Sequence, residues 1–175
     1  MKINPLLKQY VTESILKTSF RFPSRFNLPP TAFRIAIEQL TRIIPQPKNV
    51  EFRQLRIAGI RAEEIKPKPE TTQMIFHIHG GAFMVGSLKT HRAFLSEIAL
   101  RTQMQVLHIE YPRLTEQRYP DVGDAIYDVY QILLDQGIQP KDIILSGDSC
   151  GANLALALVL RLKQEAPETV PSGLI

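Results

Sequence analysis

From about residue 50 onward, the apolar positions of the chain follow two alternating patterns. Short runs rich in Ile, Val and Leu predict strands, and stretches with apolar residues every three or four positions predict helices. The expected strands are 50–57, 60–65, 74–78, 106–109 and 142–145, and the expected helices are 88–101, 122–134 and 151–162. Strands separated by helices indicate βαβ units, so we expect an α/β fold with a mostly parallel sheet covered by helices.

The first 48 residues contain two segments with a helical pattern. Apolar side chains recur every three or four positions over 5–20 and again over 31–44, which predicts two amphipathic helices joined by a loop. We therefore expect a helical leader or cap segment over 1–48 and an α/β core over 49–175, packed as one structural domain. At the other end of the chain, 170–175 resemble the first residues of a further buried strand.

The composition of the 175 residues is that of an ordinary globular protein, with 44% hydrophobic residues and a formal net charge of +4. This excludes the disordered, collagen-like and coiled-coil classes. No apolar run approaches the roughly 18 residues that span a bilayer. The single cysteine excludes an intramolecular disulfide framework and a Cys-cluster zinc site. Because Met1–Pro5 lack the apolar core of a signal peptide, we expect a cytoplasmic location.

The charge is distributed unevenly along the chain. Residues 1–68 hold 13 basic and 5 acidic side chains, whereas residues 69–175 hold 8 basic and 12 acidic ones. The basic residues are spread among apolar positions and form no run, which is typical of a solvated face. No zinc-finger spacing or RNA-binding signature accompanies them. We therefore expect no nucleic-acid partner and no membrane span; the alternative for the basic segment 1–68 is approach to nucleic acid or to an anionic membrane surface.

The sequence Gly-Asp-Ser-Cys-Gly at 147–151 lies between a predicted strand and a predicted helix. A Gly-x-Ser-x-Gly motif in that setting is typical of a nucleophile elbow, which presents the Ser149 hydroxyl at the carboxyl end of a strand. Flanking glycines let the backbone pass closely, and the helix start directs N–H groups towards developing negative charge. The structural alternative is a Gly/Ser turn before a buried helix. Cys150 is one place from the centre of the motif, so its side chain is expected to pack beside the turn.

A second motif, His-Gly-Gly-Ala-Phe at 79–83, directly follows the predicted strand 74–78. Glycine-rich backbone after a strand can aim N–H groups at the oxyanion of an acyl-transfer intermediate, and one such donor is worth about 3–4 kcal/mol of barrier. The alternative is an ordinary loop before a helix. Two motifs of this kind, each following a strand, favour ester hydrolysis by Ser149.

These two motifs, the longer run Gly-Asp-Ser-Cys-Gly-Ala-Asn-Leu-Ala and the segment Tyr-Pro-Arg-Leu at 111–114 resemble the hormone-sensitive-lipase-like esterases. That family has the α/β-hydrolase fold, cleaves carboxylic esters and carries N-terminal helices as part of a cap. The resemblance covers about 70–163. It implies that Ser149 is the nucleophile acting on a small-molecule ester substrate, without any cofactor or metal.

The resemblance also implies how the oxyanion is held. The backbone N–H groups of Gly81, Ala82 and Cys150 would be the donors, and His79 and Gly80 would shape the loop. The chain departs from the family at three places: Ala82 stands where a third glycine is frequent, Cys150 stands where Gly or Ala is usual, and the usual Tyr-Arg-Leu-Ala-Pro-Glu is altered. The first two changes leave the backbone donors in place, whereas the third concerns the local loop structure.

The sequence lacks a recognisable acid and base for Ser149. In α/β-hydrolases the acid and the histidine follow the serine, but all four histidines precede it here, and Glu165 and Glu168 are the only acids after it. The resemblance therefore implies a truncated, N-terminal part of an esterase. With later strands absent, 143–145 would lie along an open apolar edge, so self-association or a complementing C-terminal fragment is expected.

Other interpretations remain open. The chain could be a non-catalytic small-molecule-binding relative, or an inactive remnant that keeps the pattern. His77 and His79 share a strand face and could form a metal pair, as could His108 and Glu110, but neither pair has an evident third ligand. His91 is predicted to lie on a helix surface.

Overall fold

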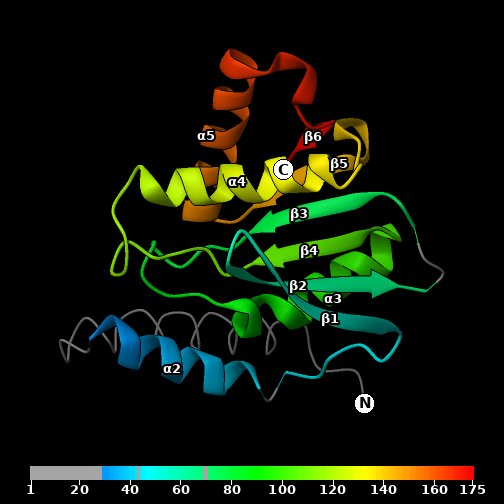
Figure 1. Ribbon diagram of the computed structural model, residues 1–175. Helices are drawn as coiled ribbons and strands as arrows, with labels where there is room; N and C mark the ends of the chain where they lie inside the picture. Colours follow the sequence, from blue (N-terminus) through cyan, green and yellow to red (C-terminus); the bar gives the residue numbers. More distant parts are fainter. Residues whose placement is uncertain (1–28, 43, 69–70) are drawn as a thin grey trace, which may run out of the picture.

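The computed structural model describes residues 29–42, 44–68 and 71–175 (Figure 1). The helix predicted over 5–20 lies outside these residues. The helix predicted over 31–44 is α2, Pro30–Thr41, which begins one residue earlier and ends three residues sooner. The division of the chain at residue 48 stays a prediction.

The described residues form one six-stranded sheet in the order β1-β2-β4-β3-β5-β6. Its strands are β1 Val50–Ile57, β2 Ile60–Pro67, β3 Met74–Ile78, β4 Gln105–Ile109, β5 Ile143–Gly147 and β6 Gly173–Leu174. β3 pairs in parallel with β4 and β5, and β5 pairs in parallel with β6. β2 is antiparallel to both β1 and β4. This confirms the predicted α/β fold with a mostly parallel sheet.

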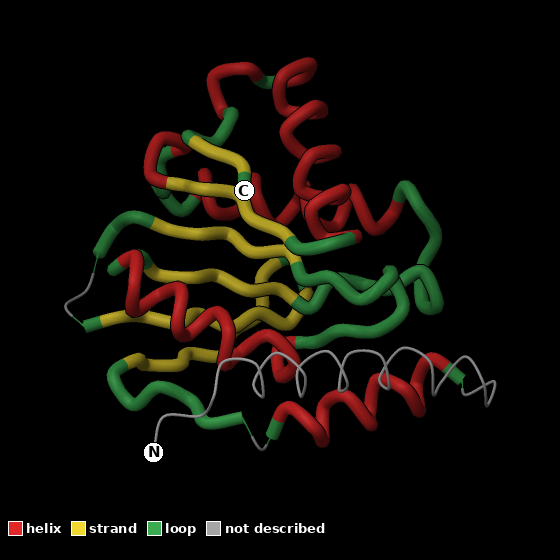
Figure 2. The backbone as a smooth tube through the Cα atoms, turned by 180° about the vertical axis from the view of Figure 1, so that it is seen from behind, coloured by secondary structure: helices red, strands yellow, loops and turns green. Residues whose placement is uncertain are grey.

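Helices cover both faces of the sheet. They are α3 Leu88–Thr102, α4 Asp121–Asp135 and α5 Cys150–Glu165. α3 packs on β1, β2 and β4 and contacts α2, whereas α5 packs on β3, β5 and α4. In Figure 1, α4 lies in front of the sheet; in Figure 2, from behind, α3 crosses the opposite face.

The two faces follow from the period-two alternation of the strands. Phe76 of β3 packs in the larger core under α4 and α5, whereas its neighbour Ile75 packs in the smaller core under α3. In β4, Leu107 and Val106 divide between the two cores in the same way. His77 therefore projects towards α3, a direction that determines its neighbours in the site.

A tight two-residue turn joins β1 to β2. Ala58 and Gly59 connect β1 to β2 with φ angles of 49° and 76°. A two-residue hairpin turn with both φ values positive matches the right-handed twist of the strands it joins, and glycine supplies one of them without strain.

The open edge predicted along 143–145 is wrong. The N–H of Ser172 donates to Ile143 O at 2.9 Å, and the N–H of Ile175 donates to Leu145 O at 3.0 Å. The short strand β6 thus covers this side of β5 because its register satisfies the carbonyl groups there. The prediction that 170–175 begin another strand is confirmed, and Leu174 and Ile175 are exposed.

No helix within the described ranges is long and apolar enough to cross a membrane.

Candidate active site

Ser149 stands at the sharp turn between β5 and α5. β5 ends at Gly147, two residues later than predicted, and α5 begins at Cys150, so the turn contains only Asp148 and Ser149. Ser149 is exposed and adopts φ 51° and ψ −121°, an unusual conformation for a residue with a Cβ. Such backbone strain costs on the order of 1–3 kcal/mol and persists only where the surrounding structure enforces it.

The two glycines around Ser149 make this turn possible. A Cβ on Gly147 would lie 2.5 Å from the carbonyl carbon of Gly151, and a Cβ on Gly151 would lie 2.1 Å from Ile78 O. Both contacts are with backbone, which cannot rotate away. The first turn of α5 is therefore pressed directly against the end of β3, and only glycine fits at either position.

The loop after β3 is bonded to this turn. The N–H of Gly80 donates to Asp148 Oδ1 at 2.8 Å, and the N–H of Phe83 donates to Cys150 Sγ at 3.2 Å. The buried Cys150 side chain thus packs beside the turn as predicted. Residues 79–83 and 148–150 are therefore neighbours in space, although 65 positions separate them in the sequence.

His79 anchors the base of the same loop. Its ring is buried and stacks on the Tyr111 ring with 4.4 Å between centroids, and the Tyr111 hydroxyl donates to the carbonyl oxygen of His79 at 2.8 Å. His79 Nδ1 lies 2.8 Å from Gly80 O. These contacts account for a structural role of His79 in shaping the loop.

The N–H groups of Gly81, Ala82 and Cys150 make no hydrogen bond within the described part of the chain. Gly81 and Ala82 both have positive φ, of 124° and 53°, which bends the loop away from the strand direction. Cys150 is the first residue of α5, where the N–H groups lack helical partners and favour a negative ligand. This geometry can stabilise an oxyanion next to Ser149.

Arg113 anchors the segment 111–116, which follows β4 and differs from the family sequence. Its buried guanidinium donates to Gly86 O at 2.9 Å and to the Glu110 carboxylate at 2.8 Å. It also pairs with Glu116 at 3.0 Å. Gly86 lies just beyond the glycine-rich loop, so this segment braces that loop despite its departure from the family sequence.

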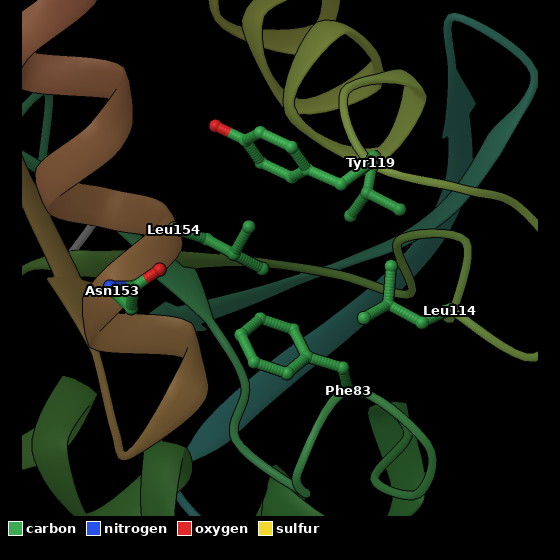
Figure 3. Close-up of a pocket in the computed structure, with 6 residues that line it drawn as sticks. Phe83, Leu114, Tyr119, Asn153 and Leu154 are labelled. Atoms are coloured by element: carbon green, nitrogen blue, oxygen red, sulfur yellow. The ribbon is translucent and has the colours of Figure 1, made fainter.

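A cavity of about 300 Å³ opens beside the loop and α5 (Figure 3). The Phe83, Leu114 and Leu154 side chains point into one space, with the Tyr119 ring closing one side. Its lining residues are Phe83, Leu114, Tyr119, Val122, Asn153 and Leu154. Phe83 follows Ala82 directly, and Leu154 lies one turn of α5 beyond Cys150, so the cavity can hold an apolar group of a ligand bound near these segments.

The four histidines lie together on the α3 side of the sheet rather than beside Ser149. His91 was predicted on a helix surface, which is wrong: its side chain turns inward, 3.2 Å from Asp148. Its spacing from Leu88 and Leu95, both buried on α3, is the signal that could have placed it on the inner face. Within the described residues, no side chain makes a hydrogen bond with the Ser149 hydroxyl.

Burial controls the ionisation of this cluster. It lowers the pKa of His79 to about 3, and electrostatic interactions with Arg113 and the other histidines act in the same direction. Burial likewise lowers the pKa of His77 and takes that of His108 well below its usual value. These imidazoles are therefore neutral near pH 7.

The carboxyl of Asp148 behaves in the opposite way. Partial burial alone would raise its pKa, but the neighbouring imidazoles of His77 and His91 and the N–H of Gly80 outweigh this and hold the pKa well below its usual range. Asp148 is therefore ionised at neutral pH and supplies the negative charge of the cluster.

We expect the folded state to lose stability as the pH falls from 6.5 towards 4.5. Unfolded histidines take up protons near pH 6.5, whereas buried His79 and His108 do not, so the unfolded state binds more protons in this window. Each such histidine removes about 1.4 kcal/mol per pH unit below 6.5. Urea unfolding at a series of pH values measures this loss of stability. A free energy of unfolding that is independent of pH between 6.5 and 4.5 would contradict the prediction. Asp148 contributes only below about pH 4, the unfolded value of its pKa.

Comparison with known proteins gives consistent similarities. The sequence pattern of the alpha/beta hydrolase fold family matches residues 75–175. An esterase of Acinetobacter venetianus is 60% identical over all 175 residues, which span 57% of that protein. An acetyl-hydrolase of Streptomyces hygroscopicus is 31% identical over 114 residues, covering 65% of this chain and 38% of that protein.

Among solved structures, an esterase from the bacterial hormone-sensitive lipase family is similar with a TM-score of 0.80 at 27% identity. The match covers 99% of this chain and 57% of that one. This chain therefore spans less than two thirds of the length of each of these three relatives.

Proposed function

The chain belongs to the α/β-hydrolase family, among the hormone-sensitive-lipase-like esterases, and from this premise we propose that Ser149 is the nucleophile of a carboxylic-ester hydrolase. One observation carries the proposal. The strained, exposed Ser149 stands between β5 and α5. The N–H groups of Gly81, Ala82 and Cys150, which make no hydrogen bond within the described residues, lie on the two segments that hydrogen bonds join there.

The proposed first step forms a bond between Ser149 Oγ and the carbonyl carbon of the ester. The hydroxyl proton passes to a general base, and the carbonyl electron pair moves to its oxygen. The N–H groups of Gly81, Ala82 and Cys150 stabilise this oxyanion. Its collapse expels the alcohol, which takes the proton, and leaves an acyl group on Ser149. Water then attacks the acyl carbon by the same route and releases the acid.

The general base and its acidic partner are proposed to come from outside these 175 residues. No histidine follows Ser149 in the sequence, and the four imidazoles that precede it lie together on the α3 side of the sheet. The exposed Leu174 and Ile175, at the edge of the sheet beyond β5, are the proposed contact for the polypeptide that supplies them.

Fragment complementation tests this arrangement. The 175-residue chain is mixed with the part of the Acinetobacter venetianus esterase that it does not span, and hydrolysis of p-nitrophenyl acetate is followed. We expect the rate to rise at least about 100-fold over either component, since general acid–base catalysis contributes about 10²–10⁴-fold. An unchanged rate would count against the proposal that a second polypeptide supplies the base and its acidic partner. Full activity of the chain alone would place the base within it.

The cavity beside Ser149 is proposed to hold the acyl group of a short-chain ester. Its volume of about 300 Å³ is at the small end of ligand pockets, and its walls are mainly apolar. The relative from Streptomyces hygroscopicus is named an acetyl-hydrolase, which agrees with a small acyl group.

Leu114→Trp is expected to narrow the acyl preference. Leu114 lines the cavity and is partly exposed, so the larger ring fits without disturbing the core. In the complemented enzyme, kcat/KM for a butyrate ester should fall about 10-fold relative to that for acetate, the scale of discrimination by a hydrophobic pocket. Leu160→Trp is the matched control, because Leu160 is an exposed leucine of α5 that does not line the cavity. An equal change for both esters would argue against the acyl assignment.

A further inference from the structure

All four histidines of the chain gather in one cluster under α3. Ring centroids lie 5.8 Å apart for His77 and His91, and 5.6 Å apart for His77 and His108. His79 is 5.6 Å from both His91 and His108. The side chains come from β3, the following loop, α3 and β4. The proposed esterase chemistry uses none of these imidazoles as a base.

Three side chains of this region converge on one point. His77 Nε2 lies 3.4 Å and His91 Nε2 lies 3.2 Å from Asp148 Oδ1, and ligand atoms from the three residues all lie within 4.8 Å of one another. Zinc–nitrogen and zinc–oxygen bonds of about 2.0–2.1 Å place the ligands of a tetrahedral site about 3.3 Å apart. The two separations from Asp148 Oδ1, 3.4 and 3.2 Å, match that value.

The remaining ring nitrogens are held in the way that metal-binding histidines require. His77 Nδ1 bonds with Ser146 Oγ at 3.1 Å, and His91 Nδ1 bonds with Thr90 Oγ1 at 2.8 Å. Such outer contacts fix the orientation of each ring and leave Nε2 for the metal. His77 is almost completely buried, yet its Nε2 makes no properly aligned hydrogen bond within the described residues. A buried polar atom of this kind needs an explanation, and a bound ion is one that the geometry around His77 supports.

We propose that His77, His91 and Asp148 bind a divalent cation of the zinc class. Two imidazoles and one carboxylate suit zinc, whereas magnesium and calcium favour oxygen ligands. The side chain of Asp148 is 46% exposed and that of His91 is 18% exposed, so solvent water can reach a fourth coordination position. Asp148 is ionised and the His77 imidazole is neutral at pH 7, as metal ligands must be.

The proposed site adjoins the ester site without sharing its reacting groups. Asp148 Oδ1 also accepts the N–H of Gly80, so a bound cation would act on the loop that carries the proposed oxyanion donors. The binding itself is independent of the proposed esterase function, because it requires neither Ser149 nor a complementing fragment.

Metal titration of the full 175-residue chain tests the proposal. After dialysis against a chelator and its removal, ZnCl₂ is titrated by calorimetry at pH 7.5. We expect one Zn²⁺ per chain and a rise in the thermal unfolding midpoint, since a ligand that binds only the folded state stabilises it. His91→Gln and Asp148→Asn should each weaken binding at least about 10-fold. Asp142→Asn, at an acidic position away from the cluster, is the matched control and should bind as the wild type does.

Cobalt(II) gives a spectroscopic check on the ligands. Co²⁺ in the proposed site should show visible d–d absorption of a tetrahedral nitrogen and oxygen complex, and His91→Gln should lose it. Absence of stoichiometric zinc binding would overturn the proposal. Equal affinity in His91→Gln and the wild type would do so too, as would a thiolate-to-cobalt charge-transfer band, because it would place the metal on Cys150 instead.

Discussion

Ser149→Ala is expected to lower ester hydrolysis by the complemented enzyme about 10⁴–10⁶-fold. Removing the serine of a comparable catalytic unit costs this much, because the acyl-enzyme route is lost and only oxyanion stabilisation and binding remain. The fold should be unaffected, since the Ser149 side chain is exposed and makes no hydrogen bond within the described residues. Rates of p-nitrophenyl acetate hydrolysis, with the variant and the wild type mixed with the same complementing fragment, measure the effect.

Ser172→Ala is the matched control for this loss. Its hydroxyl donates to Ile143 O at 2.8 Å, far along β5 from the turn, so the rate should stay close to that of the wild type. Mass spectrometry adds a direct test, because the wild type should carry one acyl group on the peptide that contains Ser149. Equal rates for Ser149→Ala and the wild type would refute the assignment of the nucleophile.

Gly151→Ala is expected to lower the free energy of unfolding by about 3 kcal/mol or more. The added methyl group would lie 2.1 Å from Ile78 O and 2.7 Å from His79 O, so α5 must move away from the end of β3. Adding atoms to a well-packed core usually costs about 1–3 kcal/mol. A clash with rigid backbone lies at or above the top of that range. Urea unfolding monitored by circular dichroism measures the change. Activity of the complemented enzyme should fall as well, because the movement separates Cys150 from the loop.

Gly123→Ala separates this steric effect from helix propensity. Gly123 also lies in a helix, α4, but the nearest atom to an added methyl group there is Tyr119 Cε2 at 3.7 Å, an ordinary contact. Alanine in that position should stabilise the chain by about 0.5–1 kcal/mol, since glycine is the poorer helix former. Similar free energies of unfolding for the two variants would show that the close approach at Gly151 carries no cost.

Much of the fold was predictable from local pattern. The strands at 50–57 and 74–78 have the predicted bounds, because their apolar runs end at turn residues such as Ala58 and at the glycine-rich loop. α4 differs from its predicted range by one residue at each end. The prediction of an open edge along 143–145 was wrong, because the pairing of the two-residue strand β6 with β5 depends on where the chain returns after α5.

The candidate ester site was predictable in part for the same reason. The strand–turn–helix context of Ser149 and the loop at 79–83 are local features, and the sequence displays each of them. The hydrogen bonds from Gly80 to Asp148 and from Phe83 to Cys150, which join the two segments, are not local. They depend on the parallel pairing of β3 with β5, and no pattern within either segment specifies that register.

The sequence by itself determined the alternation of strands and helices, the glycine-flanked serine turn and the lack of a histidine after Ser149, because each depends on residues close together in the chain or on order alone. Only the tertiary structure decided that His91 turns inward and meets His77 beside Asp148. Three separate elements, β3, α3 and the turn after β5, must pack in one register to bring these side chains within 4.8 Å. That register is set by the buried contacts of the whole α3 face, which many distant residues determine together.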